Sequence, residues 1–200
     1  MEDLIDRVER RVNGLPAGLR AHIYRVRAVG RELARCHGVD EERAALAMLA
    51  HDVARAMPDD ELLSDAAALD LPIGTVERVA PVLLHGPVGA GLLARDDGLA
   101  DPSLHQAVYW HTTAHPSLDD LGKVVFLADK LDPQKIGVYP YLPQLRELAL
   151  EDLDRAVLEF LTRETVSLAS QGMLVHPMVI ETRNHLLAAS GSVGVSSVRS

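Results

Sequence analysis

His51 and Asp52 are two adjacent side chains of metal-ligand type inside an apolar segment. They stand in the run 49–54, which is Leu-Ala-His-Asp-Val-Ala. An ionised carboxylate removed from water must be paired or must coordinate a metal, because its desolvation is costly. Two alternatives follow from this. Either Asp52 faces solvent at a helix edge while His51 fills a polar niche, or both residues bind a metal ion.

Other histidines and aspartates also interrupt segments that should be apolar. His22 lies between Leu19 and Val26 on one helical stripe, and Asp129 interrupts the apolar run 124–131. One such residue is most often a core polar group that has found a partner. Three helices that each direct one such polar residue into the core favour a metal ion bound by all three, because metal sites in helical cores are built in this way.

His85 and His111 extend this set, although each alone is typical of a capping or stacking histidine. The six candidate metal ligands are His22, His51, Asp52, His85, His111 and Asp129. A set of nitrogen and carboxylate ligands suits Fe, Mn, Co or Zn better than Mg or Ca. Six ligands exceed the need of one catalytic ion, so Asp52 could bridge two ions that bind a phosphate and activate a water together. His115 has helical spacing from His111, but Pro116 argues against a continued helix, and we expect His115 not to be a ligand.

The elements that must position these residues show helical periodicity, without convincing strand alternation. Helical patterns cover residues 4–12, 17–37, 40–56, 59–69, 75–84, 102–111 and 124–131, followed by a long stretch to Gln171 and a last helix from Pro177. We expect Thr75 to cap one helix, Ser117 to open a capping box, and His85-Gly86-Pro87 to break the chain before a further turn. The pattern predicts one all-α domain over 1–189 and a disordered tail over 190–200.

Composition limits the classes of function. Hydrophobic residues make up 48% of the 200 residues and charged residues 24%, which is typical of a globular protein. The net charge of −9 argues against a nucleic-acid or membrane partner, since either needs a basic face. No apolar run has membrane-spanning length, and the acidic N-terminus does not resemble a signal peptide. Cys36 is the only cysteine, so we expect a reducing cytoplasm. Composition leaves open whether the chain forms a homodimer.

The order His22, His51-Asp52 and Asp129 resembles the HD-domain metal-dependent phosphohydrolases. The surrounding residues at 84–90, 109–113, 128–133, 146–149 and 183–184 resemble the YqeK-type family of symmetrical bis(5′-nucleosyl)-tetraphosphatases. The resemblance extends over roughly His22 to Asn184. It implies a single HD-domain helical bundle with a buried dinuclear metal site. It also implies hydrolysis of diadenosine tetraphosphate, a small-molecule nucleotide, into two ADP by a metal-activated water.

The resemblance also implies roles for individual residues. His22, His51, Asp52 and Asp129 would hold one ion, while His85 and His111 would complete the second, with Asp52 bridging. The expected catalytic residues are Asp52, Asp129 and His111, and the expected substrate contacts are Arg55, Thr112, Lys130 and Lys135. The expected cofactors are two divalent or trivalent transition-metal ions, iron first, with manganese or cobalt as alternatives.

Two other functions stay open. The chain departs from the family pattern at Arg55, Tyr109 and His115, and the last two replace arginines. This leaves the number of substrate phosphates undecided. An HD phosphohydrolase that acts on another nucleotide is therefore one alternative. A nucleotide-binding sensor or partner protein that keeps its metal site only for stability is the other.

Overall fold

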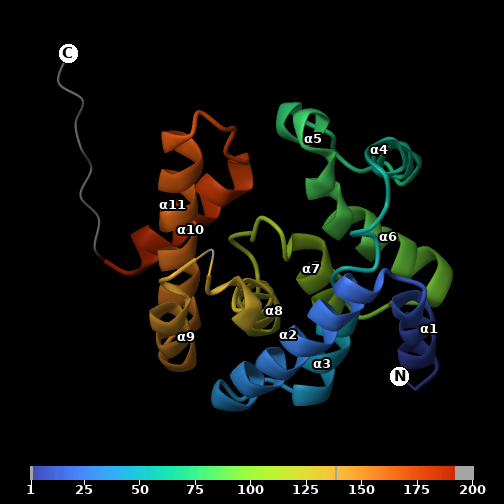
Figure 1. Cartoon of the computed structure of the whole chain (residues 1–200), viewed down its shortest axis with the longest axis horizontal. Coiled ribbons are helices and arrows are strands. Elements are labelled where there is room, and N and C mark those ends of the chain that lie inside the picture. The colour runs from blue at the N-terminus through green and yellow to red at the C-terminus, as the bar shows by residue number, and fades with distance from the viewer. Residues whose placement is uncertain (1, 138, 192–200) are drawn as a thin grey trace.

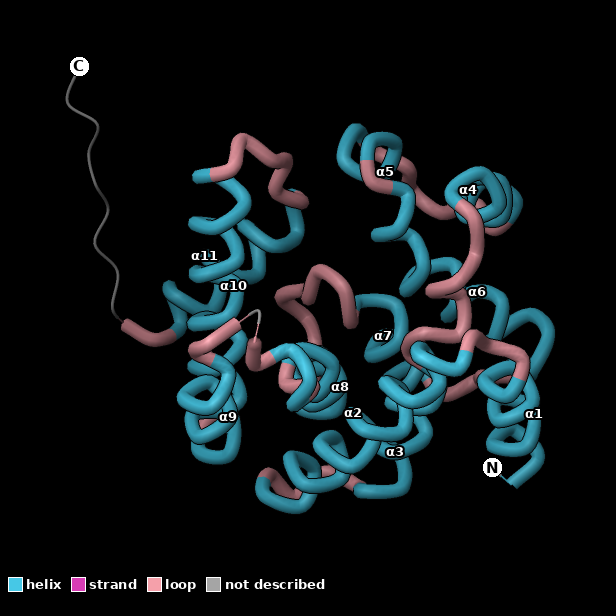
Figure 2. The backbone as a smooth tube through the Cα atoms, viewed as in Figure 1, coloured by secondary structure: helices cyan, strands magenta, loops and turns pink. Residues whose placement is uncertain are grey.

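In the computed structural model, which describes residues 2–137 and 139–191, all regular elements are helical (Figure 1). The tube view accordingly shows helices joined by loops (Figure 2). The helices are α1 (Glu2–Asn13), α2 (Ala17–Cys36), α3 (Glu41–Ala50), α4 (Asp59–Ala68), α5 (Thr75–Val79), η1 (Pro81–Leu84), α6 (His85–Asp97), α7 (Pro102–Trp110), α8 (Asp120–Lys130), η2 (Pro133–Lys135), α9 (Leu142–Glu151), α10 (Leu153–Ser170) and α11 (Pro177–Ala189). The all-α prediction is confirmed.

Helix α8 lies at the centre of the packing, against α2, α3, α7 and α10. Its apolar run is buried, and the Phe126 ring packs edge-on against Phe160 of α10 with 5.6 Å between the ring centroids. Helix α2 approaches α3 closely at Gly30, where an added Cβ would lie 2.6 Å from Cγ of Met48. This close packing brings the polar residues of α2, α3 and α8 to one region of the core.

Two outer groups of helices flank this centre. Helices α4, α6 and η1 enclose a small second apolar cluster around Leu62 and Leu84. Helix α10 packs on both α9 and α11 on the opposite side of the molecule (Figure 1). The two groups stand apart at the top of this view, where α5 faces the loop between α10 and α11. Among the described residues, no helix is long and apolar enough to cross a bilayer.

Three of the helices expected from sequence have different boundaries. The third ends at Ala50 rather than Ala56, because the backbone bonds after it change to i−3 spacing and form successive turns. The helix expected over 75–84 divides into α5 and η1, since Pro81 disfavours helical geometry at the residue before it. The long stretch before Gln171 divides at Asp152, whose side chain accepts from the Arg155 N–H and caps α10.

The expected caps and the expected break also differ. Gly74 rather than Thr75 precedes α5, and the Glu77 carboxylate accepts from its N–H. Asp119 rather than Ser117 caps α8. Residues 85–87 start α6 instead of breaking the chain, because a proline in the first turn needs no N–H partner. The tail expected over 190–200 lies outside the described residues from 192 onward.

Candidate metal centre

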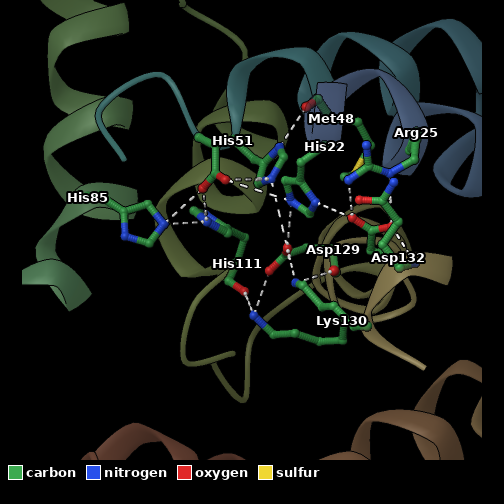
Figure 3. A network of polar contacts seen from close by, with 12 residues as sticks. His22, Arg25, Met48, His51, His85, His111, Asp129, Lys130 and Asp132 are labelled. Atoms are coloured by element: carbon green, nitrogen blue, oxygen red, sulfur yellow. Dashed lines mark hydrogen bonds and ion pairs between the residues drawn. The ribbon is translucent and has the colours of Figure 1, made fainter. Parts of the chain in front are cut away.

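The six candidate ligands converge on one buried point from five separate segments, and Figure 3 labels all of them except Asp52. They come from α2 (His22), the turn after α3 (His51 and Asp52), the start of α6 (His85), the end of α7 (His111) and α8 (Asp129). His51 is fully buried and Asp52 is 6% exposed. The simpler alternative, in which Asp52 faces solvent, is therefore wrong.

The two carboxylate oxygens of Asp52 face different pairs of histidines. Oδ1 lies 3.0 Å from Nε2 of His85 and 3.4 Å from Nε2 of His111. Oδ2 lies 3.4 Å from Nε2 of His51 and 3.8 Å from Nε2 of His22. Asp52 thus stands between two half-sites, each offering its own pair of imidazole nitrogens.

Asp129 belongs to the half-site of His22 and His51. Its Oδ1 lies 3.1 Å from Nε2 of His22 and 4.0 Å from Nε2 of His51. Two overlapping groups have ligand atoms that all lie within 4.8 Å of one another, and each could hold a metal ion. These groups are His22, His51 and Asp129, and His51, Asp52 and His111.

Hydrogen bonds fix the tautomer of each ring. His51, His85 and His111 place Nδ1 against the backbone carbonyl oxygen three residues earlier, and a carbonyl can only accept. His22 places Nδ1 against the Asp132 carboxylate instead, at 2.7 Å. Nδ1 therefore carries the hydrogen in all four rings. The Nε2 atoms of all four rings face inward, which is the arrangement of histidines that bind a metal through Nε2.

Two observations on the inward-facing Nε2 atoms indicate that a cation can bind between them. His51 Nε2 is buried and has no hydrogen-bond partner among the described residues. The Nε2 atoms of His85 and His111 lie 2.9 Å apart, and two lone pairs at this distance repel each other unless a proton or a cation stands between them. Burial lowers the pKa of His111 to about 4, so a proton does not fill this place on His111 near neutral pH.

The charges of the cluster also fit a cation. Burial disfavours ionisation of Asp52, but the histidine rings hold its pKa well below its usual range. Asp129 is likewise buried, and Lys130 and His22 hold its pKa well below its usual range. Against the effect of burial, the two aspartates raise the pKa of His51. Both carboxylates are thus anionic at neutral pH, and a metal ion must compete with a proton at His51.

A cavity of about 660 Å³ opens above the cluster, and all four expected substrate residues line it. The Arg55 side chain is exposed and forms no hydrogen bond or ion pair with the other described residues. Lys130 lies 2.7 Å from Oδ2 of Asp129, and Lys135 lies 3.2 Å from its Oδ1. The two lysines therefore neutralise a candidate ligand, while Arg55 and Thr112 face the cavity without such a contact.

The residues of the far wall of this cavity, and Asp132 beneath its floor, were not predicted from the sequence. The far wall includes Phe160 and Glu164 of α10 and His176 before α11. Apolar positions on α10 follow the same helical period whether they pack on a core or line a cavity, so no sequence signal separates them. Asp132 lies three residues after Asp129 and could have been found from that spacing.

The expectation for His115 agrees with its position. Its ring stacks on Trp110 with 4.5 Å between the centroids, and Nδ1 lies 2.7 Å from the Ser117 hydroxyl. His115 is not part of either candidate metal group, nor does it line the cavity.

Comparison with known proteins gives consistent results. The HD domain family profile matches residues 19–134, a range that contains all six candidate ligands. The symmetrical bis(5′-nucleosyl)-tetraphosphatase of Bacillus subtilis is 31% identical over 159 residues, covering 80% of this chain and 84% of that protein. The protein of the same name from Halalkalibacterium halodurans is 29% identical, covering 83% and 87%.

One solved structure is similar over nearly the whole fold. It belongs to a protein from Clostridium acetobutylicum that is described as a predicted HD superfamily hydrolase involved in NAD metabolism. The likeness has a TM-score of 0.86 at 27% sequence identity, and covers 92% of this chain and 97% of that chain. The helices that carry the buried cluster therefore follow an arrangement also seen by crystallography.

Proposed function

Because this chain belongs to the HD domain family, we propose that it is a metal-dependent symmetrical bis(5′-nucleosyl)-tetraphosphatase. Its reaction is the hydrolysis of diadenosine tetraphosphate into two ADP. One observation carries the proposal: four inward-facing Nε2 atoms, one of them without a hydrogen-bond partner among the described residues, meet two ionised carboxylates at the floor of a cavity that three cationic side chains line. The names of the relatives from Bacillus and Halalkalibacterium support the choice of substrate.

We propose two ion positions that share Asp52. His22, His51, Asp129 and Asp52 would hold the first ion, and His85, His111 and Asp52 would hold the second. Transition-metal ions in such a site supply an activated water and take up negative charge on the phosphate oxygens. Iron is our first choice and manganese or cobalt the alternatives, because all three accept imidazole and carboxylate ligands.

The remaining polar residues of the cavity bind the phosphate chain. Arg55 offers a planar fork of donors that suits phosphate oxygens, and Thr112 offers a hydroxyl group. Lys130 and Lys135 both contact Asp129 and both line the cavity, so they balance the charge of the ligand and of the substrate. Asp52, Asp129 and His111 would take part in the reaction as ligands of the ions, because an ionised carboxylate does not bind an anionic phosphate oxygen directly.

We propose that residues 1–189 work as one domain, because both halves of the chain line the same cavity, from Pro16 to Val179. The single cysteine supports a cytoplasmic location, where thiols stay reduced. A homodimer stays a prediction.

Product analysis tests the proposed reaction. Protein loaded with Fe²⁺ or Mn²⁺ is incubated with diadenosine tetraphosphate, and the nucleotides are separated by chromatography. ADP as the only product supports the proposal, whereas AMP with ATP contradicts symmetrical cleavage. Turnover of NAD⁺ or a mononucleotide, with diadenosine tetraphosphate left intact, would favour another nucleotide as the substrate. Metal binding without turnover of any nucleotide would favour the sensor function.

Arg55→Ala is expected to raise KM for diadenosine tetraphosphate more than it lowers kcat. A hydrogen bond to a charged group contributes about 1.5–3 kcal/mol, which corresponds to roughly 10- to 100-fold in KM. Arg55→Lys keeps the positive charge but loses the planar pair of donors, so its KM is expected to lie between those of the wild type and Arg55→Ala. Steady-state kinetics of the three proteins measures this, and an unchanged KM in Arg55→Ala would exclude Arg55 as a phosphate contact.

His176→Asn is expected to raise KM several-fold and to leave metal affinity unchanged. His176 lines the cavity, and its Nε2 lies 2.6 Å from the Glu77 carboxylate, so this contact joins the α10–α11 loop to α5. Asparagine keeps the N-cap of α11 that His176 provides, and only the contact with Glu77 is lost. His185→Asn, an exposed change on the same helix, is the control and should behave like the wild type.

A further inference from the structure

His22 differs from the other three histidines of the cluster in the partner of its Nδ1 atom. The others donate to backbone carbonyls, whereas His22 donates to Oδ2 of Asp132 at 2.7 Å. The Asp132 side chain is only 2% exposed. A buried carboxylate is costly. A backbone carbonyl is enough to orient each of the other three histidines, so the carboxylate of Asp132 behind His22 needs a separate explanation.

Four donors hold the Asp132 carboxylate in one orientation (Figure 3). Arg25 forms a fork on it, with Nε 3.1 Å from Oδ1 and Nη2 2.8 Å from Oδ2. The Gln134 N–H donates to Oδ1 at 3.0 Å, and His22 donates to Oδ2. Arg25 follows His22 by three residues on α2, so both side chains reach the carboxylate from the same helix face.

The same short segment contacts both nitrogens of the His22 ring. Asp129 faces Nε2 at 3.1 Å and Asp132 accepts from Nδ1, so the ring lies between two carboxylates three residues apart. A ring held at both ends cannot rotate or exchange its tautomer without breaking one of these contacts. None of the other three rings has a side-chain carboxylate behind it.

We propose that Asp132, held by Arg25, is a positioning residue that makes the half-site of His22, His51 and Asp129 the tighter of the two ion sites. A carboxylate behind a histidine fixes its orientation and makes the opposite nitrogen a stronger donor to a metal than a carbonyl does. The half-site of His85 and His111 has no such carboxylate. The inference rests on the proposed role of His22 as a metal ligand.

Stepwise metal binding tests the inference without any enzyme assay. The full chain is freed of metal and titrated with Mn²⁺ against a competing chelator, and the visible spectrum of the Co²⁺-loaded protein is recorded separately. The wild type is expected to bind two ions in separate steps. Asp132→Asn is expected to weaken the tighter step about 10- to 100-fold, to leave the weaker step unchanged, and to alter the Co²⁺ spectrum.

Two further variants make the result specific. Arg25→Gln leaves the His22 contact with Asp132 intact but removes the fork, so the tighter step should weaken by less than in Asp132→Asn. Asp152→Asn makes the same chemical change at a helix cap outside the cavity, and both steps should match the wild type. If Asp132→Asn does not fold, the Arg25→Gln titration decides the question.

The outcomes separate this inference from the proposed function. A wild type that binds no transition metal contradicts both. A wild type that binds two ions, with both steps unchanged in Asp132→Asn or in Arg25→Gln, overturns the inference and leaves the proposed function intact. A lower melting temperature of the metal-free Asp132→Asn protein with unchanged metal affinity also overturns it, because Asp132 would then serve only the fold.

Discussion

Asp52→Asn is expected to abolish turnover of diadenosine tetraphosphate while leaving the protein folded. Asp52 supplies one oxygen to each proposed ion position, so its replacement weakens both sites at once. Loss of an outer partner of a metal ligand already costs about 10- to 100-fold. Loss of the shared ligand itself should therefore cost at least about 100-fold in kcat/KM.

The fold should tolerate this change because the amide of asparagine has the same shape as the carboxylate and adds two N–H donors. The inward-facing Nε2 atoms of His85 and His111 lie within reach of the donors, at 3.0 Å and 3.4 Å from Oδ1 of Asp52. The melting temperature of the metal-free variant should therefore stay within a few degrees of the wild type.

Kinetics, elemental analysis and circular dichroism measure these effects together. Asp52→Asn should bind at most one ion per chain, against two in the wild type. Asp60→Asn on the exposed start of α4 is the matched control and should keep full activity and metal content. Wild-type turnover by Asp52→Asn would rule out Asp52 as a bridging ligand.

The ligand set could be predicted from sequence because each member breaks a strong apolar pattern. Asp129 interrupts a buried run on α8, and His22 lies on the buried stripe of α2. The local geometry of His51 and Asp52 could not be predicted in the same way, since helical periodicity continues past Ala50 where the chain turns. That turn is what allows two adjacent side chains to face the same point.

The cavity wall and the charge network could not be read from sequence, because both depend on contacts between distant segments. The fork from Arg25 to Asp132 joins residues 107 positions apart, and the contact of Glu77 with His176 joins residues 99 positions apart. Local patterns place each residue on a helix or in a loop but do not pair them. The direction of the Lys130 side chain depends on such contacts as well, because its Nζ donates to the backbone oxygen of His111, 19 positions earlier, as well as to Asp129.

Removal of the metal ions is expected to lower the melting temperature, and the effect should shrink as the pH falls. Bound ions at about 100 times their Kd stabilise the folded state by about 2.7 kcal/mol. For a chain of this size that corresponds to roughly 5–10 °C. Addition of Fe²⁺ or Mn²⁺ to the chelated protein should restore the melting temperature.

The pH dependence follows from the two histidines whose pKa values shift in opposite directions. The carboxylates raise the pKa of His51, so below this pKa a metal ion must displace a proton from Nε2, and affinity should fall about tenfold per pH unit. Burial lowers the pKa of His111 to about 4, so this ring stays a neutral ligand in the same range. As the pH decreases, the affinity for the metal ion should therefore fall first because His51 becomes protonated.

Thermal melts of the loaded and chelated protein between pH 8 and pH 5 test this sign. In the metal-free protein, His111 is protonated in the unfolded chain before the folded one, so its contribution to stability is lost as the pH falls from 6.5 towards about 4. His51 has the opposite sign, because its raised pKa favours the folded state at low pH and loses this effect as the pH rises. The two effects oppose each other, so the melting temperature of the chelated protein should change less with pH than that of the loaded protein. A metal-dependent increase of the same size at pH 8 and pH 5 would show that His51 does not exchange a proton for a metal ion, and would remove it from the ligand set.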